Sequence, residues 1–322
     1  MLLDAQGLPS RWLTAKMKSM NAVALSEVTK TFGDQVAVDC LSLAVPAGSI
    51  YGFIGPNGSG KTTTLRMIMH ILHPDRGKIT VLGKNTFQAA NDRVGYLPEE
   101  RGLYRKMKVR DLLRFYAELK GFRGSGPAID TWLKRLDLAA WANKKVQALS
   151  KGMAQKVQFI STVIAKPELV LLDEPFSGLD PVNAEVLRDA VLGLKRDGAT
   201  VIFSTHDMAV AEQMCDFIFM IYRAKKVLDG TLHTIQETYG SDTVRVRLGG
   251  NGVSLDGLPG VTAVRDLGQC QEMQLNRGAD PQQLLAALMG RAPVQHFELH
   301  RPSLHDIFIR IARPDEESNN HA

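Results

Sequence analysis

A glycine-rich turn near residue 55 limits what this chain can fold into more than any other feature. It follows the apolar run Ser49–Ile54, precedes a helix expected over Thr62–His73, and reads Gly55-Pro56-Asn57-Gly58-Ser59-Gly60-Lys61-Thr62. This is the GxxxxGK[ST] pattern of a phosphate-binding loop between a strand and a helix. Glycines let successive backbone N–H groups face one anion, and the helix directs its positive end at that anion. The loop therefore predicts a nucleotide site on an α/β sheet.

Two side chains of the loop would contribute to nucleotide binding in addition to its backbone N–H groups. Lys61 supplies a full positive charge for the β- and γ-phosphates, and the Thr62 hydroxyl is a ligand for Mg²⁺. Because short motifs also occur by chance, the prediction of a nucleotide site depends on further motifs downstream.

Two carboxylates follow the apolar run Val170–Leu172. At a strand tip beside the phosphate loop, Asp173 is placed to hold Mg²⁺, directly or through water. Alternation along the strand is expected to turn Glu174 to the other side, where it can polarise a water molecule aimed at the γ-phosphate. The alternative is a surface turn of the type Asp-Glu-Pro, and the phosphate loop upstream argues against it.

A second phosphate site is predicted before the helical stretch Ala154–Ile164, where the chain reads Ser150-Lys151-Gly152-Met153. Ser150 suits the N-cap of that helix, and Gly152 permits close approach of the backbone. Further on, Asp180 and Pro181 begin the next helix. His206 ends the apolar strand Val201–Thr205; a lone histidine is usually structural, but at this strand tip a contact with the γ-phosphate is the better hypothesis.

With these five motifs in order, residues 22 to about 235 resemble the ATP-binding subunit of an ABC transporter. The resemblance implies an ATPase that uses ATP and Mg²⁺ and forms a head-to-tail dimer, here expected to be a homodimer. ATP would lie between residues 55–63 of one protomer and residues 150–153 of the other, which explains two phosphate sites in one chain. A polytopic membrane subunit is the implied partner, and it would hold the protein peripherally at the cytoplasmic face of the membrane.

The resemblance also implies roles for individual residues. Phosphate would be bound by Gly55, Pro56, Asn57, Gly58, Ser59, Gly60, Lys61, Thr62 and Thr63, and in trans by Ser150, Lys151, Gly152 and Met153. Thr62 and Asp173 would hold Mg²⁺, Glu174 would act as base, His206 would sense the γ-phosphate, and Asp180 would communicate with the opposite site. Phe32 matches the position where the family stacks adenine, because stacking needs a π-face; the alternative is a core phenylalanine at a strand end.

Two positions depart from the family pattern. Glu99 stands in the loop that usually carries a glutamine, a residue that ligates Mg²⁺ and links the nucleotide to the membrane partner. Glutamate can ligate too, but it adds negative charge near the phosphates, so the net effect is left open. In the second site, lysine and methionine replace glycine and glutamine. Lys151 either pairs with phosphate or a partner carboxylate, or it is a solvated lysine.

Two further segments, 96–104 and 302–308, look like a branch of ATPase subunits from sodium-exporter, drug-exporter and gliding-associated systems. This resemblance implies an exporter with a separate membrane subunit. The region Glu99–Leu119 is where contact with that subunit is expected, since it is dense in basic residues: Arg101, Arg105, Lys106, Lys108 and Arg110. The alternative is a solvated basic face.

Two other functions compete with the transporter hypothesis. ABC ATPases that act on ribosomes usually carry two nucleotide domains, and those that act on DNA carry long coiled coils; this chain has neither feature. A different phosphate-loop enzyme, such as a kinase, has no use for the second phosphate site or for His206.

Composition places limits on the remaining possibilities. The chain has 322 residues, 44% hydrophobic and 23% charged, with a formal charge of +5 carried by scattered basic residues, which predicts no binding of nucleic acid. Its apolar runs do not exceed six residues, whereas a spanning helix needs about 20. The three cysteines form no CxxC pair, so we expect reduced thiols packed as small hydrophobic residues.

The predicted fold is therefore α/β, a P-loop NTPase of the ABC ATPase type with a mixed sheet core and a helical subdomain at about 100–165. This ATP-binding domain is expected over 22–239, followed by a small α+β domain over 240–313 with short glycine-punctuated strands. Residues 1–21 lack the apolar core of a secretory signal and are expected to be a disordered extension; an amphipathic surface helix is the alternative. The polar segment 314–322 is expected to be a disordered tail.

Overall fold

The computed structural model describes residues 21–85, 93–100, 102–239, 243–249, 253–276 and 278–312. The predictions for the N-terminal extension, for Arg101 and for the C-terminal tail fall outside these residues. The chain divides into two compact units, one up to Thr231 and one from Leu232. The domain bounds given above stay a prediction.

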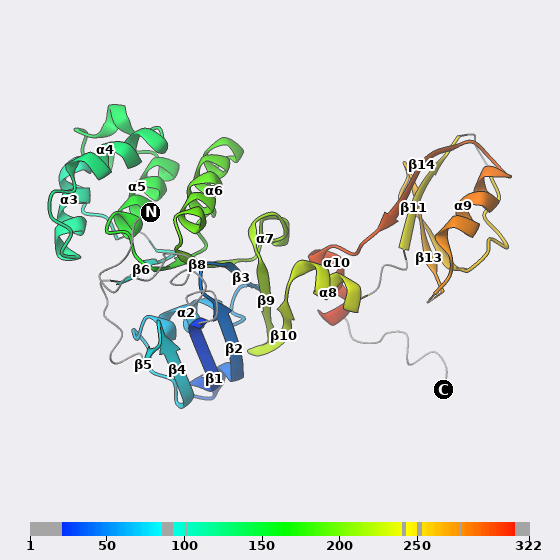
Figure 1. The fold of residues 1–322 in the computed structure, drawn as a ribbon, viewed down its shortest axis with the longest axis horizontal. Helices are drawn as coiled ribbons and strands as arrows, with labels where there is room; N and C mark the ends of the chain where they lie inside the picture. Colours follow the sequence, from blue (N-terminus) through cyan, green and yellow to red (C-terminus); the bar gives the residue numbers. More distant parts are fainter. Residues whose placement is uncertain are drawn as a thin grey trace, which may run out of the picture. The chain divides into compact units, whose positions relative to one another are not determined.

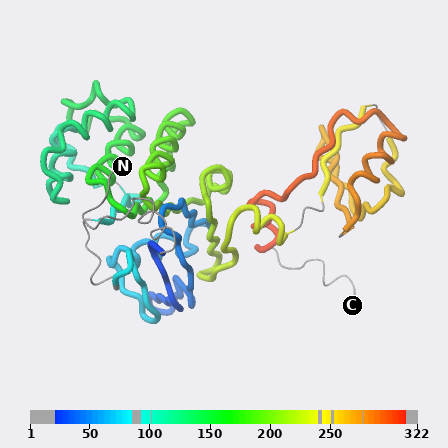
Figure 2. Tube along the Cα trace, in the orientation of Figure 1, coloured from blue at the N-terminus to red at the C-terminus, as the bar shows by residue number. Residues whose placement is uncertain are grey.

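A six-stranded sheet forms the centre of the first unit, in the order β10-β9-β3-β8-β7-β6. Its strands are β3 (Ile50–Ile54), β6 (Val94–Leu97), β7 (Leu169–Asp173), β8 (Thr200–Thr205), β9 (Phe217–Tyr222) and β10 (Lys225–Gly230). All neighbours pair in parallel except β9 and β10. Strands from distant parts of the sequence thus lie side by side, as Figure 2 shows for β3 in blue against the green β8 and β9.

A second, antiparallel sheet in the order β2-β1-β4-β5 lies in the same unit (Figure 1). It contains β1 (Asn21–Phe32), β2 (Gln35–Pro46), β4 (Arg76–Val81) and β5 (Lys84–Asn85). Its apolar residues share one hydrophobic cluster with helix α2 (Lys61–Ile68) and with one face of the central sheet, including Tyr51 and Phe53. The central strands are buried on both faces, as expected for a parallel sheet covered on each side.

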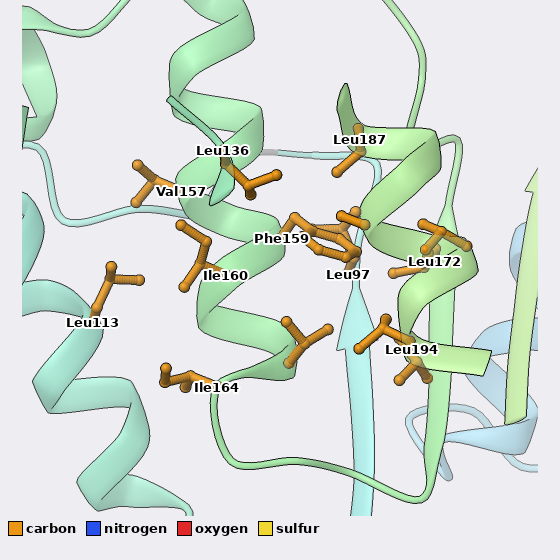
Figure 3. Close-up of a cluster of buried hydrophobic side chains, with 14 of the residues drawn as sticks. Leu97, Leu113, Leu136, Val157, Phe159, Ile160, Ile164, Leu172, Leu187 and Leu194 are labelled. Atoms are coloured by element: carbon orange, nitrogen blue, oxygen red, sulfur yellow. The ribbon is translucent and has the colours of Figure 1, made fainter. Parts of the chain in front are cut away.

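The other face of the central sheet packs against helices. They are α3 (Val109–Leu119), α4 (Gly126–Arg135), α5 (Lys151–Val163), α6 (Pro181–Arg196) and α7 (Met208–Met214), with short 3₁₀ turns at Ala139–Trp141 and Val146–Ala148. Figure 3 shows side chains from these helices meeting Leu97 and Leu172 of the sheet. Phe159 of α5 lies at the centre of this cluster, fully buried and edge-on to Trp132.

Ile160, one residue further along α5, is also fully buried in this cluster. Ile160→Val removes one methylene-sized group, and we expect it to lower the free energy of unfolding by about 1 kcal/mol. Denaturant unfolding measures this change. Val182→Ala on α6, where the side chain is 72% exposed, is the matched control and should change stability by less than about 0.5 kcal/mol. Equal effects of the two substitutions would contradict the assignment of Ile160 to the core.

The second unit is a small α+β structure. Strands β11 (Thr243–Leu248), β12 (Val261–Asp266), β13 (Gln271–Leu275) and β14 (Val294–His300) form an antiparallel sheet in the order β12-β13-β11-β14. Helix α9 (Pro281–Met289) covers one face of it through Leu284 and Leu288. Helices α8 (Leu232–Thr238) and α10 (Leu304–Ala312) are linked by hydrogen bonds, including one from the Gln236 amide to the Pro302 carbonyl at 3.1 Å.

Two predicted helices end earlier than expected. The helix after the phosphate loop stops at Ile68 rather than His73. The apolar spacing of Ile129–Leu138 predicts a helix over that range, and α4 stops at Arg135. In each case a left-handed residue closes the helix, His70 with φ 59° and Asp137 with φ 56°. The N–H of the following residue bonds back to the fifth carbonyl before it, which is the Schellman arrangement.

The prediction for the cysteines also needs correction. Cys215 is largely buried, and burial raises the pKa of its thiol. Cys40 is exposed and has a positive φ of 48°, so it is not packed as a small hydrophobic residue. Among the described residues, no group of histidine, cysteine and acidic side chains has the geometry of a metal site.

Candidate active site

The phosphate-binding loop joins β3 to α2, as its pattern predicts. The loop requires glycine at Gly60, because φ there is 114° and a Cβ would lie 2.4 Å from the carbonyl oxygen of Ala37. The hydroxyl of Ser59 is buried in the loop without a hydrogen-bond partner among the described residues. A tight backbone turn with an unsatisfied donor inside it is suited to an anion.

Lys61 begins α2 and is only 5% exposed. Its ammonium donates to the carbonyl oxygens of Gly55 at 2.8 Å and Pro56 at 3.1 Å, and lies 3.8 Å from a carboxylate oxygen of Glu174. Burial lowers the pKa of Lys61, while the nearby carboxylates, with Glu174 foremost, oppose that shift. A compact cation is thus held at the floor of the loop by groups that can release it to a phosphate.

Asp173 is the last residue of β7 and is fully buried. Its Oδ1 accepts hydrogen bonds from Thr62 at 3.1 Å and from Ser204 at 2.6 Å. Its Oδ2 is buried without a hydrogen-bond partner among the described residues, and so is the hydroxyl of Tyr96, whose pKa is raised first by burial and also by the charge of Asp173. A buried carboxylate oxygen without a donor is a free ligand position, and hard cations such as Mg²⁺ prefer oxygen ligands.

Glu174 follows directly and turns toward a different set of groups. Its carboxylate oxygens lie 3.0 and 3.1 Å from Nδ1 of His206, and its backbone N–H donates to Ser204 at 3.0 Å. Strand alternation does not explain why the Glu174 side chain points away from that of Asp173. Strand β7 ends at Asp173, and Glu174 itself has a left-handed φ of 48°. Glu174 is 7% exposed, whereas His206 is exposed at the edge of the sheet.

A pocket of about 480 Å³ brings nine of the predicted residues together. Its lining residues are Phe32, Gln35, Ala37, Asn57, Gly58, Gly60, Lys61, Thr62, Thr63, Glu99 and Glu174. Phe32 is 49% exposed, so it is not the core phenylalanine of the alternative hypothesis. Its ring lies in the pocket lining with the Lys30 ammonium 5.4 Å from the ring centroid, and Glu99 lies in the lining of the same pocket.

The second predicted phosphate site lies elsewhere on the unit. Ser150 caps α5, and its hydroxyl accepts a hydrogen bond from the backbone N–H of Met153 at 3.3 Å. A separate pocket of about 350 Å³ is lined there by Leu103, Arg105, Val146, Gln147, Leu149, Ser150, Lys151 and Ala154. The two pockets share no lining residue.

Lys151 crosses the loop that follows Asp173 and Glu174. A Cβ on Gly178 would lie 2.6 Å from the Lys151 ammonium nitrogen, so the lysine side chain rests on this glycine. A Cβ on Gly152 would lie 3.3 Å from Leu179 in the same loop. That loop ends at Asp180, which caps α6 and whose pKa is lowered by hydrogen bonds from Asn183. The segment predicted to be a second phosphate site and this loop therefore form one packed surface.

The structure also shows site residues that the sequence did not reveal. Ser204 pairs in register with Asp173 on the neighbouring parallel strand, so a hydroxyl near the end of an apolar strand was the available signal. Gln155 and Gln158 are buried polar residues of α5, 3% and 5% exposed. Their amides donate to carbonyl oxygens in the loops after β7 and β6. Periodicity alone gives no reason to expect them.

Comparison with known proteins identifies the fold. Residues 38–177 match the family model for the ABC transporter, and residues 230–312 match a model for the ATP-binding protein DrrA1-3-like C-terminal domain. The chain is 43% identical over 289 residues to the ABC transporter ATP-binding protein YhaQ of Bacillus subtilis, covering 89% of this chain and 97% of that one. This chain belongs to the ATP-binding subunits of ABC transporters.

Other relatives agree with this assignment. The Nod factor export ATP-binding protein I of Sinorhizobium fredii is 32% identical over 303 residues, covering 92% of this chain and 88% of that protein. A solved structure described as the ATP-binding subunit of an ABC transporter superposes with a TM-score of 0.64 and 28% identity, over 68% of this chain and 93% of the other. The predicted fold class is therefore confirmed.

ABC ATP-binding subunits bind ATP and hydrolyse it to power transport, and the predicted ATPase activity is confirmed at this level. Such subunits act together with membrane subunits. Among the described residues, no helix is both long and apolar enough to cross a bilayer. The roles of individual residues remain predictions.

Proposed function

We propose that this chain is the energy-coupling ATPase of a membrane exporter and works as a head-to-tail homodimer. ATP would bind to the phosphate loop of one protomer and be closed over by the Ser150–Met153 segment of the other. Closure would push on a polytopic membrane subunit, and hydrolysis would reset the dimer. The protein would lie peripherally at the cytoplasmic face of the membrane through that subunit.

One observation carries the proposal of a head-to-tail dimer. The pocket of the phosphate loop and the pocket at the start of α5 share no lining residue, although both offer backbone or side-chain donors to an anion. Phe32 and Glu99, which line the pocket of the phosphate loop, are both exposed. A second copy in head-to-tail arrangement would bring the two pockets of different protomers together around one ATP.

The residues around Asp173 fit Mg²⁺. Oδ2 of Asp173 is buried without a donor, and the Thr62 hydroxyl lies 3.1 Å from Oδ1. We therefore assign Thr62 and Asp173 to the metal, with Glu99 as a further oxygen ligand from the pocket lining. When bound, the ion neutralises charge on the β- and γ-phosphates. Lys61 would leave its two loop carbonyls and donate to the same phosphates.

Glu174 and His206 would handle the attacking water. The carboxylate of Glu174 is held by His206 Nδ1 and by the neighbouring Lys61, so its direction is fixed before substrate arrives. Glu174 would orient and deprotonate the water, and His206 would contact the γ-phosphate through its other ring nitrogen. Phe32 would stack on adenine, and Asp180 would face the opposite site across the dimer.

The direction of transport is proposed from two similarities. Several relatives are named Nod factor export ATP-binding protein I, and the second unit matches the DrrA1-3-like C-terminal domain. Neither similarity identifies what this protein's partner carries. Action on ribosomes or DNA is the competing proposal, and the same experiment distinguishes the two.

The test is purification of a trapped complex. Tagged Glu174→Gln would be expressed in the native cells, extracted in detergent with ATP, and its associated proteins identified by mass spectrometry. A stoichiometric polytopic membrane protein is the expected result. Ribosomal proteins or bound DNA without any membrane protein would overturn the exporter proposal.

The basic residues near α3 give a second prediction. Arg105, Lys106 and Lys108 are exposed, whereas Arg110 is paired with Asp130. Reversing the charge at Lys106 and Lys108 to glutamate should uncouple transport from hydrolysis, because the two exposed cations would no longer meet the partner. ATP affinity should stay within about twofold, and transport should fall by about tenfold or more. Transport assays in vesicles alongside nucleotide titration measure both.

Charge reversal at Lys134 of α4 and Arg196 of α6 serves as the control, since both residues are exposed. Equal losses of transport in the control pair would show that total charge, rather than this surface, is responsible.

A further inference from the structure

Gln158 of α5 is a buried polar residue that the proposed chemistry does not use. It is 5% exposed, and its side-chain nitrogen lies 3.4 Å from the carbonyl oxygen of Pro98 and 3.3 Å from that of Glu100. The amide group carries two N–H donors, which is one for each carbonyl. These two carbonyls flank Glu99 on both sides.

The contact has an energetic cost that a hydrophobic residue would avoid. The side-chain oxygen of Gln158 is buried without a hydrogen-bond partner among the described residues. An unsatisfied buried acceptor destabilises the fold, so burial of this side chain is not explained by packing. One side chain of α5 thus reaches the carbonyls on both sides of Glu99. Gln158 is therefore an anchor of this loop.

The same helix contacts two other parts of the site. Three residues earlier, Gln155 donates to the carbonyl oxygen of Pro175 at 3.2 Å, directly after Glu174. The helix begins at the cap formed by Ser150. One rigid element therefore connects the segment that would close on a partner's ATP, the segment that carries the proposed base, and the loop that carries Glu99.

We propose that Gln158 is a positioning residue that holds Glu99 at the nucleotide pocket and couples the position of Glu99 to that of α5. Any displacement of the loop at Glu99 is passed by the Gln158 amide to the helix, and the reverse also holds. This inference rests on the proposed role of Glu99 at the phosphates. It adds a residue and a physical connection that the proposed function does not require.

A double-mutant cycle tests the proposal. Gln158→Met keeps the size of the side chain and removes both donors, and Glu99→Ala removes the carboxylate. The steady-state kcat and the Mg²⁺ concentration for half-maximal ATP hydrolysis would be measured for the parent, both single variants and the double variant. We expect Gln158→Met to lower kcat by about tenfold, and to have no further effect in the Glu99→Ala background. Gln213→Met, at an exposed position of α7, is the control.

A second measurement reports on the loop itself. Backbone hydrogen exchange of the peptide that carries Glu99 should become faster in Gln158→Met, while exchange in β3 and the thermal midpoint stay near those of the parent.

Each remaining outcome overturns the inference. If the fold-losses of kcat in the two single variants multiply in the double variant, Gln158 acts independently of Glu99. Unchanged kcat or unchanged exchange in Gln158→Met would show that the contact does not position the loop. If Glu99→Ala behaves like the parent, the inference fails together with the proposed role of Glu99. In that case ATP hydrolysis by the parent protein would still support the proposed ATPase function, which does not depend on Glu99.

Discussion

Glu174→Gln is expected to lower the rate of ATP hydrolysis by at least about 100-fold while ATP still binds. The substitution keeps the size and the hydrogen-bonding shape of the side chain but removes the basic carboxylate. The Glu174 carboxylate of the parent lies 3.0 Å from His206 Nδ1 and 3.8 Å from the Lys61 ammonium. Glu174 is buried, with only 7% of its surface exposed. A neutral amide there can orient a water molecule but cannot take its proton.

The measurement is single-turnover hydrolysis together with equilibrium binding of ATP. Binding should change by less than about threefold, because the phosphate cradle is formed by the loop and Lys61 rather than by Glu174. Glu185→Gln on α6 makes the same chemical change at an exposed position and should leave both quantities unchanged. A Glu174→Gln variant that hydrolyses ATP within a few-fold of the parent would remove Glu174 from the role of base.

The sequence was sufficient to predict the central sheet because its strands are short apolar runs that end in functional residues. In a parallel sheet the carboxyl ends of the strands lie along one edge, so motifs after β3, β7 and β8 had to meet. The structure does place Thr62 within hydrogen-bond distance of Asp173, and Glu174 within ion-pair or hydrogen-bond distance of Lys61 and His206. It places Ser150 and Lys151 in the lining of a different pocket.

Helix ends were predicted less well, and the reason is local. His70 and Asp137 take the left-handed conformation that glycine usually supplies, so no glycine marks the end of either helix. The turn at Glu174 is similar, because its left-handed φ replaces the strand alternation that the sequence suggests. Tertiary contacts impose backbone conformations of this kind, and the local sequence does not predict those contacts.

Buried amides were beyond prediction for a different reason. Gln155 and Gln158 are buried residues of α5, and the buried residues next to them, such as Val157 and Ile160, are apolar. A polar residue on a buried helical face is unfavourable until the loops that accept its hydrogen bonds are known. Only the folded arrangement, with the loops after β6 and β7 against α5, gives these residues a partner.

Lys61→Met is expected to weaken ATP binding by about 100-fold or more without unfolding the protein. Hydrogen bonds between an ammonium and phosphate oxygens contribute about 1.5–3 kcal/mol each, and a loop lysine reaches two phosphates. Lys61 is 5% exposed, and burial lowers the pKa of its ammonium, so the folded protein already stabilises this cation less well than water does. A bound triphosphate would place negative charge beside the Lys61 ammonium and so stabilise its charged form.

The stability of the variant separates this explanation from a structural one. Methionine fills nearly the same volume and removes a desolvated charge, while the carbonyls of Gly55 and Pro56 lose their donor. These changes oppose one another, so the thermal midpoint should stay within a few degrees of the parent. Lys134→Met, at an exposed position of α4, is the matched control and should bind ATP normally. Tight ATP binding by Lys61→Met would mean that the backbone cradle alone holds the phosphates, whereas a large loss of stability would assign Lys61 to holding the loop.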